Sequence, residues 1–306
     1  MTSPASTKMG VLASCREFFE MIKVSHTLFA LPFAIGAVFL ALRGQQIPVS
    51  ELLLLLGQVI LAVVLARTAA MSFNRWTDRH IDGANPRTMD RSIPAGRLAA
   101  STVLLATVIC VVGFLAVAAT INPLAFKLSP VVLVVILGYS WTKRFTSMCH
   151  LVLGVGLGLA PLGAWVAIRG TLMTVEGDID FTPWILAGAV MLWTAGFDIL
   201  YACLDTDFDR HQQLHSIPQR LGISAALKVA SLLHLAMALM LFWLWYFGQL
   251  GGPFLIATSI VCILLVTEHR LVKPDDLRRV NRSFFTLNAL ISLILMIALI
   301  IEGWSP

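Results

Sequence analysis

Long apolar stretches separated by short polar segments are the feature that most constrains this chain. A helix needs about 20 mainly apolar residues to cross the hydrocarbon core of a bilayer. Only 13% of the 306 residues are charged, whereas a soluble protein carries roughly a quarter. The sequence therefore predicts an all-α, polytopic membrane protein, a bundle of about nine transmembrane helices at residues 24–42, 52–73, 98–120, 123–142, 150–168, 183–204, 223–247, 250–267 and 284–302.

Lysine and arginine are distributed unevenly between the two ends of these stretches. If the N-terminus lies in the cytoplasm, 19 of the 22 basic residues fall on the cytoplasmic side, and only Arg43, Lys127 and Arg169 fall outside. Basic residues collect in cytoplasmic loops, so this pattern predicts a cytoplasmic N-terminus and explains the net charge of +5 without a nucleic-acid partner. Residues 1–22 are predicted to form a cytoplasmic N-terminal segment and residues 23–306 a single transmembrane domain.

The second predicted helix continues out of the membrane into an acidic segment. Asn74, Asp78 and Asp82 stand at i, i+4 and i+8 and are therefore predicted to share one helix face. Two carboxylates at this spacing repel each other unless a positive charge lies between them. Magnesium prefers oxygen ligands and is often held by one or two carboxylates together with substrate phosphates. Taken alone, the segment is explained equally well as a solvated acidic helix end.

A second acidic segment ends the sixth predicted helix, on the same predicted side of the membrane. Asp198, Tyr201, Asp205 and Asp209 stand at positions 0, 3, 7 and 11 and are again predicted to share a face, whereas Asp207 points elsewhere. Asp198 lies about 10 Å deeper than Asp205 at the helical rise, and an ionisable group at that depth indicates function. Two facing acidic clusters predict a metal–diphosphate site, with basic residues of the same side nearby: Arg91, Lys143 and Arg144.

A Ser-Ile-Pro step follows each acidic segment, at residues 92–94 and 216–218. Serine is a good helix N-cap and proline is tolerated in the first turn. Each step is therefore predicted to begin the next helix.

Other metal sites fit the sequence poorly. Asp205 begins a pattern similar to an EF-hand loop, but Arg210 stands where that loop needs glycine. His211 and His215 lack the third ligand of a zinc site. The five cysteines are scattered without a CxxC pair. The remaining histidines, including His150, have no partner pattern and are predicted to be packing or interfacial residues.

The two acidic segments resemble the paired motifs of the UbiA-type membrane prenyltransferase superfamily. Residues 74–82, NRWTDRHID, match its NxxxDxxxD motif, and residues 85–96, NPRTMDRSIPAG, resemble its usual continuation. Residues 198–209, DILYACLDTDFD, resemble its second motif, and residues 139–146, YSWTKRFT, resemble the basic segment that closes its fourth span. The resemblance extends from about Lys23 to the C-terminus and is strongest to the 4-hydroxybenzoate polyprenyltransferase-like branch of quinone biosynthesis.

This resemblance implies an activity, a cofactor and a location. The expected reaction is Mg²⁺-dependent transfer of a polyprenyl group from polyprenyl diphosphate to an aromatic acceptor. The favoured acceptor is 4-hydroxybenzoate, and 1,4-dihydroxy-6-naphthoate of the futalosine menaquinone route, or another aromatic, is the alternative. The expected location is the bacterial inner membrane, with the active site facing the cytoplasm. No protein partner is inferable.

The resemblance also implies a role for each set of site residues. Two pairs of carboxylates are expected to hold one Mg²⁺ each: Asp78 with Asp82, and Asp205 with Asp209. The acceptor is expected beside Asn74 and Tyr201, with Asp198 orienting or deprotonating its hydroxyl group. Basic residues are expected to neutralise the leaving diphosphate: Lys23, Arg91, Lys143 and Arg144.

Two rival classes share some of these features. A CDP-alcohol phosphatidyltransferase also binds metal and diphosphate at a membrane, but Ala100 and Leu104 stand where its motif needs the two later aspartates. A proton- or cation-coupled transporter would carry ionisable groups near the bilayer midplane. Most of the acids here lie at the predicted cytoplasmic mouth instead. Transport that persists in EDTA, without release of diphosphate, would favour the transporter.

Overall fold

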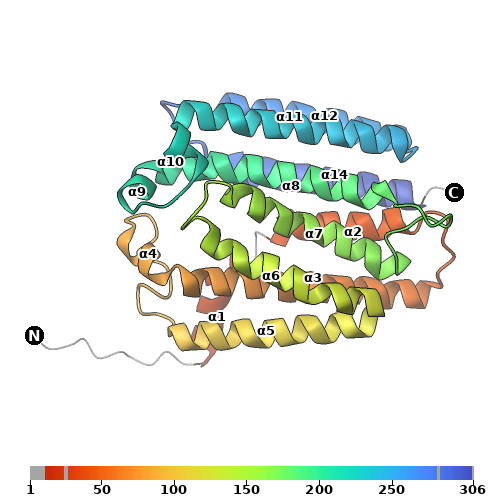
Figure 1. The fold of residues 1–306 in the computed structure, drawn as a ribbon, viewed down its shortest axis with the longest axis horizontal. Coiled ribbons are helices and arrows are strands. Elements are labelled where there is room, and N and C mark those ends of the chain that lie inside the picture. Colours follow the sequence, from red (N-terminus) through yellow and green to blue (C-terminus); the bar gives the residue numbers. More distant parts are fainter. Residues whose placement is uncertain (1–10, 24–26, 281–282, 305–306) are drawn as a thin grey trace, which may run out of the picture.

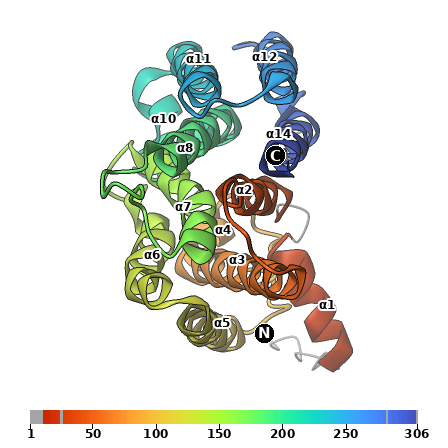
Figure 2. The same cartoon turned by 90° about the vertical axis from the view of Figure 1, so that its right-hand side faces the viewer.

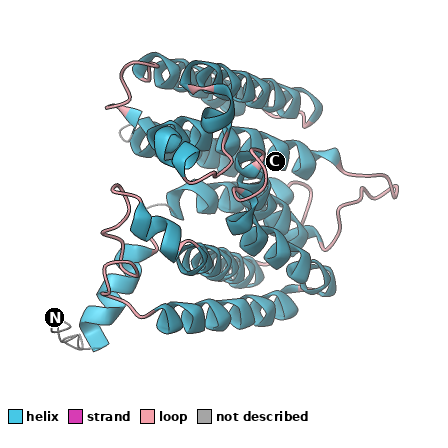
Figure 3. Ribbon diagram, turned by 60° about the vertical axis from the view of Figure 1, so that its left-hand side comes forward, coloured by secondary structure: helices cyan, strands magenta, loops and turns pink. Residues whose placement is uncertain are grey.

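The long helices of the chain run side by side and form an all-helical bundle (Figure 1). The structure, a computed structural model, describes residues 11–23, 27–280 and 283–304. Within these ranges the only extended pairings are two isolated bridges in loops, so no sheet contributes to the described fold (Figure 3). The predicted all-α class is confirmed.

Eight helices of the described residues are long and apolar enough to cross a membrane, and a further apolar helix, α2, is shorter. The apolar helices are α2 (Thr27–Ala41), α3 (Val49–Thr77), α5 (Ala100–Ile121), α6 (Pro123–Thr142), α7 (Cys149–Arg169), α8 (Phe181–Ala202), α11 (Ile223–Phe247), α12 (Gly252–Leu271) and α14 (Asn288–Trp304). A π-helical turn, η3 (Ser283–Leu287), leads into α14, and a 3-10 turn, η2 (Cys203–Asp205), follows α8. The short helices are α1 (Val11–Met21), α4 (Arg79–Ala84), α9 (Thr206–His211) and α10 (Ile217–Leu221).

Each of the nine predicted spans coincides with one of these apolar helices. The largest difference is in the second span, because α3 extends beyond both ends of the predicted range 52–73. The first span is shorter in the structure, and residues 24–26 at its predicted start lie outside the described residues. The boundary between α5 and α6 is set by Asn122, whose side chain accepts a hydrogen bond from the Ala125 amide at 2.8 Å, and by Pro123 in the first helical position.

The interior of the bundle is built around α2 and α8, which lie between the outer helices in the end-on view of Figure 2. Phe33 of α2 and Trp193 of α8 are fully buried, with ring centroids 5.1 Å apart. By contrast, Ile109 of α5 and Val134 of α6 are large apolar side chains exposed on the outside. Such an exterior suits lipid rather than water, and the chain is an integral, multi-pass membrane protein.

Helices α7 and α8 pack closely because small residues face the contact. A Cβ atom added at Gly158 of α7 would lie 2.6 Å from the backbone oxygen of Ala187 in α8, and one added at Gly154 would also meet a backbone oxygen of α8. Glycines four residues apart let two membrane helices approach to this distance.

We expect Gly158→Ala to destabilise the protein by about 1–3 kcal/mol, because the two helices must move apart to admit the methyl group. Gly163→Ala is the matched control on the same helix, since a Cβ atom there meets nothing within 4 Å. Thermal unfolding of both variants in detergent, followed by size-exclusion chromatography, measures the difference. Equal unfolding temperatures would contradict this account of the α7–α8 contact.

Helix α1 lies against the bundle. Met21 and Ile22 are buried beside Leu98 and Val103. The Glu17 carboxylate accepts hydrogen bonds from Ser92 at 2.6 Å and from Arg97 at 2.7 Å, and these bonds lower the pKa of the Glu17 carboxyl. The predicted boundary between a segment 1–22 and a domain 23–306 stays a prediction.

The two Ser-Ile-Pro steps behave differently. The Ser216 hydroxyl accepts a hydrogen bond from the Gln219 amide, and α10 begins at Ile217, as predicted. The prediction for residues 92–94 is wrong, because they form a turn and the next helix begins only at Ala100. Ser92 donates its hydroxyl to Glu17 of α1 instead of capping a helix.

Candidate active site

The first acidic segment lies at a helix break, at the end of the bundle that carries α4, α9 and α10 (Figure 1). Helix α3 ends at Thr77 and α4 begins at Arg79, so the predicted single continuous helix is interrupted at Asp78. The Asp78 amide still donates to the Asn74 carbonyl at 2.9 Å, and the Asp82 amide donates to the Asp78 carbonyl at 2.7 Å. Because both bonds keep the helical i to i−4 spacing, the three residues remain stacked across the break.

The second acidic segment is also interrupted. Helix α8 ends at Ala202, and η2 separates it from α9, so Asp198 and Asp209 do not lie on one uninterrupted α-helix as predicted. The Thr206 hydroxyl donates to the Cys203 carbonyl at 3.0 Å. Side-chain bonds of this kind compete with the helical backbone bonds and favour the tighter turn.

Both acidic segments line one cavity of about 800 Å³. Most of the residues predicted for the site contribute to its wall: Lys23, Asn74, Asp78, Asp82, Arg91, Lys143, Asp198, Tyr201, Asp205 and Asp209. Arg144 is the exception, because it contacts Asp78 without lining the cavity. The folded chain therefore brings together residues that are more than 100 positions apart in the sequence.

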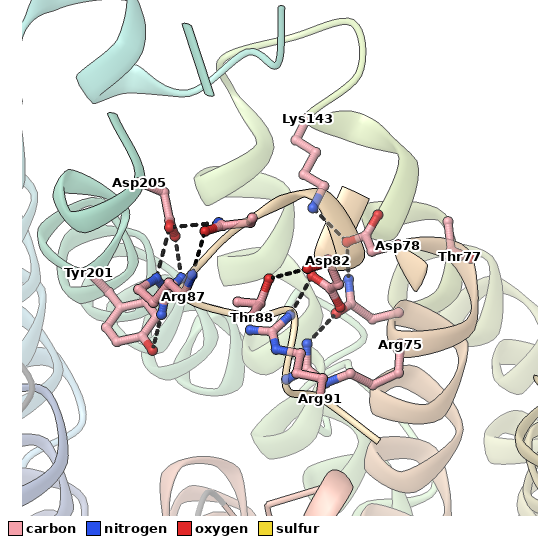
Figure 4. A network of polar contacts seen from close by, with 12 residues as sticks. Arg75, Thr77, Asp78, Asp82, Arg87, Thr88, Arg91, Lys143, Tyr201 and Asp205 are labelled. Carbon is pink, nitrogen blue, oxygen red and sulfur yellow. Dashed lines mark hydrogen bonds and ion pairs between the residues drawn. The ribbon is translucent and has the colours of Figure 1, made fainter. Parts of the chain in front are cut away.

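The Asp78 carboxylate is 2% exposed and is held by three side chains. Lys143 Nζ lies 2.5 Å from Oδ2, Arg144 Nη2 lies 3.2 Å from Oδ1, and Asn74 Nδ2 donates to Oδ2 at 3.1 Å (Figure 4). Two of these partners come from the turn after α6. The basic segment at residues 139–146 thus meets the first acidic segment directly.

The Asp82 carboxylate has one partner and one free oxygen. Arg91 Nη1 lies 2.6 Å from Oδ1 (Figure 4). Oδ2 is buried and has no hydrogen-bond partner among the described residues. A buried carboxylate oxygen without a donor is costly, and a cation at that position would satisfy it.

Asp205 is held by two residues that the sequence analysis missed. The Arg87 guanidinium binds both carboxylate oxygens, with Nε 2.8 Å from Oδ1, and Asn85 Nδ2 donates to Oδ1 at 3.0 Å. Arg87 also donates to the Tyr201 hydroxyl at 2.9 Å (Figure 4). Burial alone would lower the pKa of Arg87, but hydrogen bonds and charge attraction from Asp205 outweigh it and raise that pKa, so Arg87 stays charged. The available signal was the segment at 85–96, which continues the first motif.

The loop after α4 therefore joins the two acidic segments. It follows the first segment in sequence, and its Asn85 and Arg87 reach across to Asp205 of the second. Arg91 of the same loop turns back to Asp82 (Figure 4).

The two remaining aspartates of the second segment are each paired with one side chain. Ser216 donates to Asp209 Oδ2 at 2.8 Å. His150 Nδ1 lies 2.7 Å from Asp198 Oδ2. The prediction that His150 is only a packing or interfacial residue is wrong, because it contacts a carboxylate of the cavity wall.

The donor set fits Mg²⁺ bound together with a substrate. Within the described ranges no three His, Cys, Asp or Glu side chains gather closely enough to hold a metal by themselves. Magnesium is commonly bound by one or two carboxylates while substrate phosphates and water fill the other positions. That requirement is met by two pairs of carboxylates in the cavity wall, Asp78 with Asp82 and Asp205 with Asp209. Asp82 Oδ2, which has no hydrogen-bond partner among the described residues, is one oxygen that a cation could bind.

Away from the acidic residues the cavity wall becomes apolar. Val59 of α3 and Phe114 and Ala118 of α5 line it, as does Leu128 of α6. Val59 lies roughly 28 Å along α3 from Asp78 at the helical rise. The cavity therefore combines a charged mouth with a long apolar interior. This combination defines a class: a multi-pass membrane protein that accommodates a molecule with an anionic head and an apolar tail.

Comparison with known proteins narrows this class. The model of the UbiA prenyltransferase family matches residues 30–292. A protein of Vibrio parahaemolyticus serotype O3:K6 named 4-hydroxybenzoate octaprenyltransferase is 30% identical over 291 residues, covering 94% of this chain and 98% of that protein.

Solved structures agree. The apo structure of a UbiA homologue from Aeropyrum pernix K1 matches with a TM-score of 0.80 and 31% identity, covering 90% of this chain and 98% of that one. A UbiA homologue from Archaeoglobus fulgidus, described as bound to DMAPP and Mg²⁺, shares the fold with a TM-score of 0.67 and 16% identity, covering 93% and 99% of the two chains.

The chain belongs to the UbiA prenyltransferase family. It is a membrane-embedded prenyltransferase.

Proposed function

We propose that this enzyme transfers a polyprenyl group from polyprenyl diphosphate to the aromatic ring of 4-hydroxybenzoate, with Mg²⁺ as cofactor. The observation that carries the proposal is the single cavity whose charged mouth is formed by both acidic segments and whose interior is apolar. A diphosphate suits the mouth, and a polyprenyl chain suits the interior. The name of the Vibrio relative supports the acceptor, and the Archaeoglobus structure with DMAPP and Mg²⁺ supports the donor class and the metal.

Four carboxylates would hold the metal in this proposal: Asp78 and Asp82 from one segment, and Asp205 and Asp209 from the other. When bound, Mg²⁺ would neutralise the charge that develops on the diphosphate as the carbon–oxygen bond breaks.

Basic residues of the mouth would change partners when the donor binds. Arg87, Arg91 and Lys143 line the cavity and are paired with Asp205, Asp82 and Asp78 respectively. With a metal bound by the carboxylates, these cations would be available to the diphosphate oxygens, and Lys23, which also lines the cavity, would join them. Arg144 lies outside the cavity wall, so its proposed part is to hold Asp78 in place.

The acceptor would bind deeper than the diphosphate, near Asn74, Asp198 and Tyr201. Asp198 would accept the proton of the acceptor hydroxyl, which makes the ring a stronger nucleophile toward the allylic carbon. The ring carbon then forms the new bond as the carbon–oxygen bond to diphosphate breaks. The proton displaced from that carbon leaves with the diphosphate, which restores the aromatic ring, and the product oxygen takes back the proton held by Asp198. The apolar wall excludes water from the cationic carbon.

The location is part of the proposal. The mouth lies at the end of the bundle that carries α4, α9 and α10 (Figure 1). Loops at this end hold most of the Lys and Arg residues, which favours the cytoplasmic side of a bacterial inner membrane.

The test is turnover of labelled polyprenyl diphosphate by the purified protein in lipid nanodiscs, with Mg²⁺. The acceptors to compare are 4-hydroxybenzoate, 1,4-dihydroxy-6-naphthoate and homogentisate. We expect prenylated 4-hydroxybenzoate and equimolar diphosphate. Exclusive use of the naphthoate would replace the proposed acceptor by its alternative, and diphosphate release without any aromatic product would contradict the proposal.

A further inference from the structure

His150, which is buried, and Asp198, which is partly buried, form a pair that the roles described so far do not explain. His150 is the second residue of α7 and is 3% exposed, whereas Asp198 lies in α8 and faces the cavity. Nδ1 of His150 lies 2.7 Å from Oδ2 of Asp198. The described residues make no hydrogen bond to the other carboxylate oxygen, Oδ1. One oxygen of Asp198 is therefore engaged by protein, and the other is left for a ligand.

The far side of the imidazole decides which ring nitrogen carries the proton. The backbone amide of Ile217 donates to Nε2 of His150 at 3.3 Å. A backbone N–H can only donate, so Nε2 must be the unprotonated acceptor. The ring proton is then on Nδ1 and is directed at Asp198, because a neutral imidazole has one donor and one acceptor.

The chain that leads into α10 sets this tautomer and also contacts the second acidic segment. Ser216 donates its side-chain hydroxyl to Asp209, and the next residue, Ile217, donates its amide to His150. The same loop is fixed to the turn after α6, because the His215 amide donates to the Lys143 carbonyl at 2.6 Å. Consecutive residues at the start of α10 therefore position a carboxylate of the charged mouth and the carboxylate of the deeper cavity.

We propose that His150 is a positioning residue for acceptor activation, which acts through Asp198 and touches neither substrate. Its Nδ1–H holds Asp198 Oδ2 in place, so that Oδ1 faces the cavity and can take the proton of the acceptor hydroxyl. The inference rests on the proposed function, since it needs an aromatic acceptor with an acidic hydroxyl. His150 would thus affect the orientation of the acceptor, whereas the residues of the charged mouth would bind the diphosphate.

Two amide substitutions separate this role from simple packing. In His150→Asn the amide nitrogen occupies about the position of Nδ1 and retains a donor toward Asp198. In His150→Gln the amide lies nearer the position of Nε2 and that donor is lost. Replacing a group that orients a functional side chain without touching the substrate commonly lowers activity by about 10–100-fold. We expect His150→Gln to lower kcat/KM for the acceptor by about that factor and His150→Asn to recover most of it, while KM for the prenyl diphosphate stays unchanged in both.

The kinetics are measured on nanodisc samples whose unfolding temperatures match that of the wild type. His150→Gln is also combined with Asp198→Asn. If His150 acts through Asp198, the double variant is no slower than Asp198→Asn alone. The inference is overturned if Asn and Gln reduce turnover equally, if KM for the prenyl diphosphate rises with the loss, or if the two substitutions add. A wild-type protein that prenylates no aromatic acceptor overturns the proposed function first, and this inference with it.

Discussion

The substitutions Asp78→Asn and Asp205→Asn should each lower kcat by at least about 100-fold, although one residue comes from the first acidic segment and the other from the second. An amide keeps the size of the carboxylate but removes the charge that would hold a divalent cation. Asp78 and Asp205 line the same cavity, so a divided site loses its function when either half is neutralised. A site confined to one segment would respond to only one of the two substitutions.

Asp207→Asn is the matched control for these variants. Asp207 lies between the two aspartates of the second motif, but its side chain is 91% exposed, and among the described residues it forms an ion pair only with Arg210. Its replacement should leave turnover within about twofold of the wild type, because exposed pairs contribute little. Wild-type turnover in either Asp78→Asn or Asp205→Asn would refute the divided site. Size-exclusion profiles of all three variants distinguish lost chemistry from lost fold.

Removal of Mg²⁺ with EDTA should lower kcat by at least about 100-fold, as the substitutions do, while the protein stays folded. The reason lies in the cations that already neutralise the acidic residues. Lys143 and Arg144 hold Asp78, Arg91 holds Asp82, and Arg87 holds Asp205. These cations offset most of the negative charge of the acidic residues, so removal of metal is expected to leave few charges without a partner.

The measurement pairs activity with unfolding temperature in EDTA, followed by return of MgCl₂. Activity should return with MgCl₂, and the unfolding temperature should change by only a few degrees, the shift expected for about 1 kcal/mol in a chain of this size. Full turnover in EDTA would contradict the role of the metal. Collapse of the fold in EDTA would instead show that the cations do not balance the acidic residues.

Much of the fold follows from the sequence because a membrane restricts what a chain can do. Apolar runs of the length of a bilayer must form helices, so the nine stretches could be placed within a few residues. Polar interruptions such as Asn122-Pro123 fix where two helices meet. The helix breaks at Asp78 and η2 were not predictable in this way, because a run of helical spacing continues through both positions.

The acidic residues of the site could also be found from the sequence, since their spacing repeats within short segments. Their partners could not. Arg87 reaches Asp205 across 118 positions, and His150 reaches Asp198 across 48, so neither pair leaves a periodic trace. The first contact depends on the path of the loop after α4, and the second depends on how α7 packs against α8.

The most direct test of the divided site is calorimetric titration of the nanodisc-embedded protein with a non-hydrolysable prenyl thiodiphosphate, with and without Mg²⁺. The wild type, Asp78→Asn and Asp205→Asn are compared. We predict that the wild type binds the analogue only when Mg²⁺ is present, and that each substitution weakens this binding by at least about tenfold. Tight binding in EDTA, or weakening by only one of the two substitutions, would contradict a site built jointly from both acidic segments.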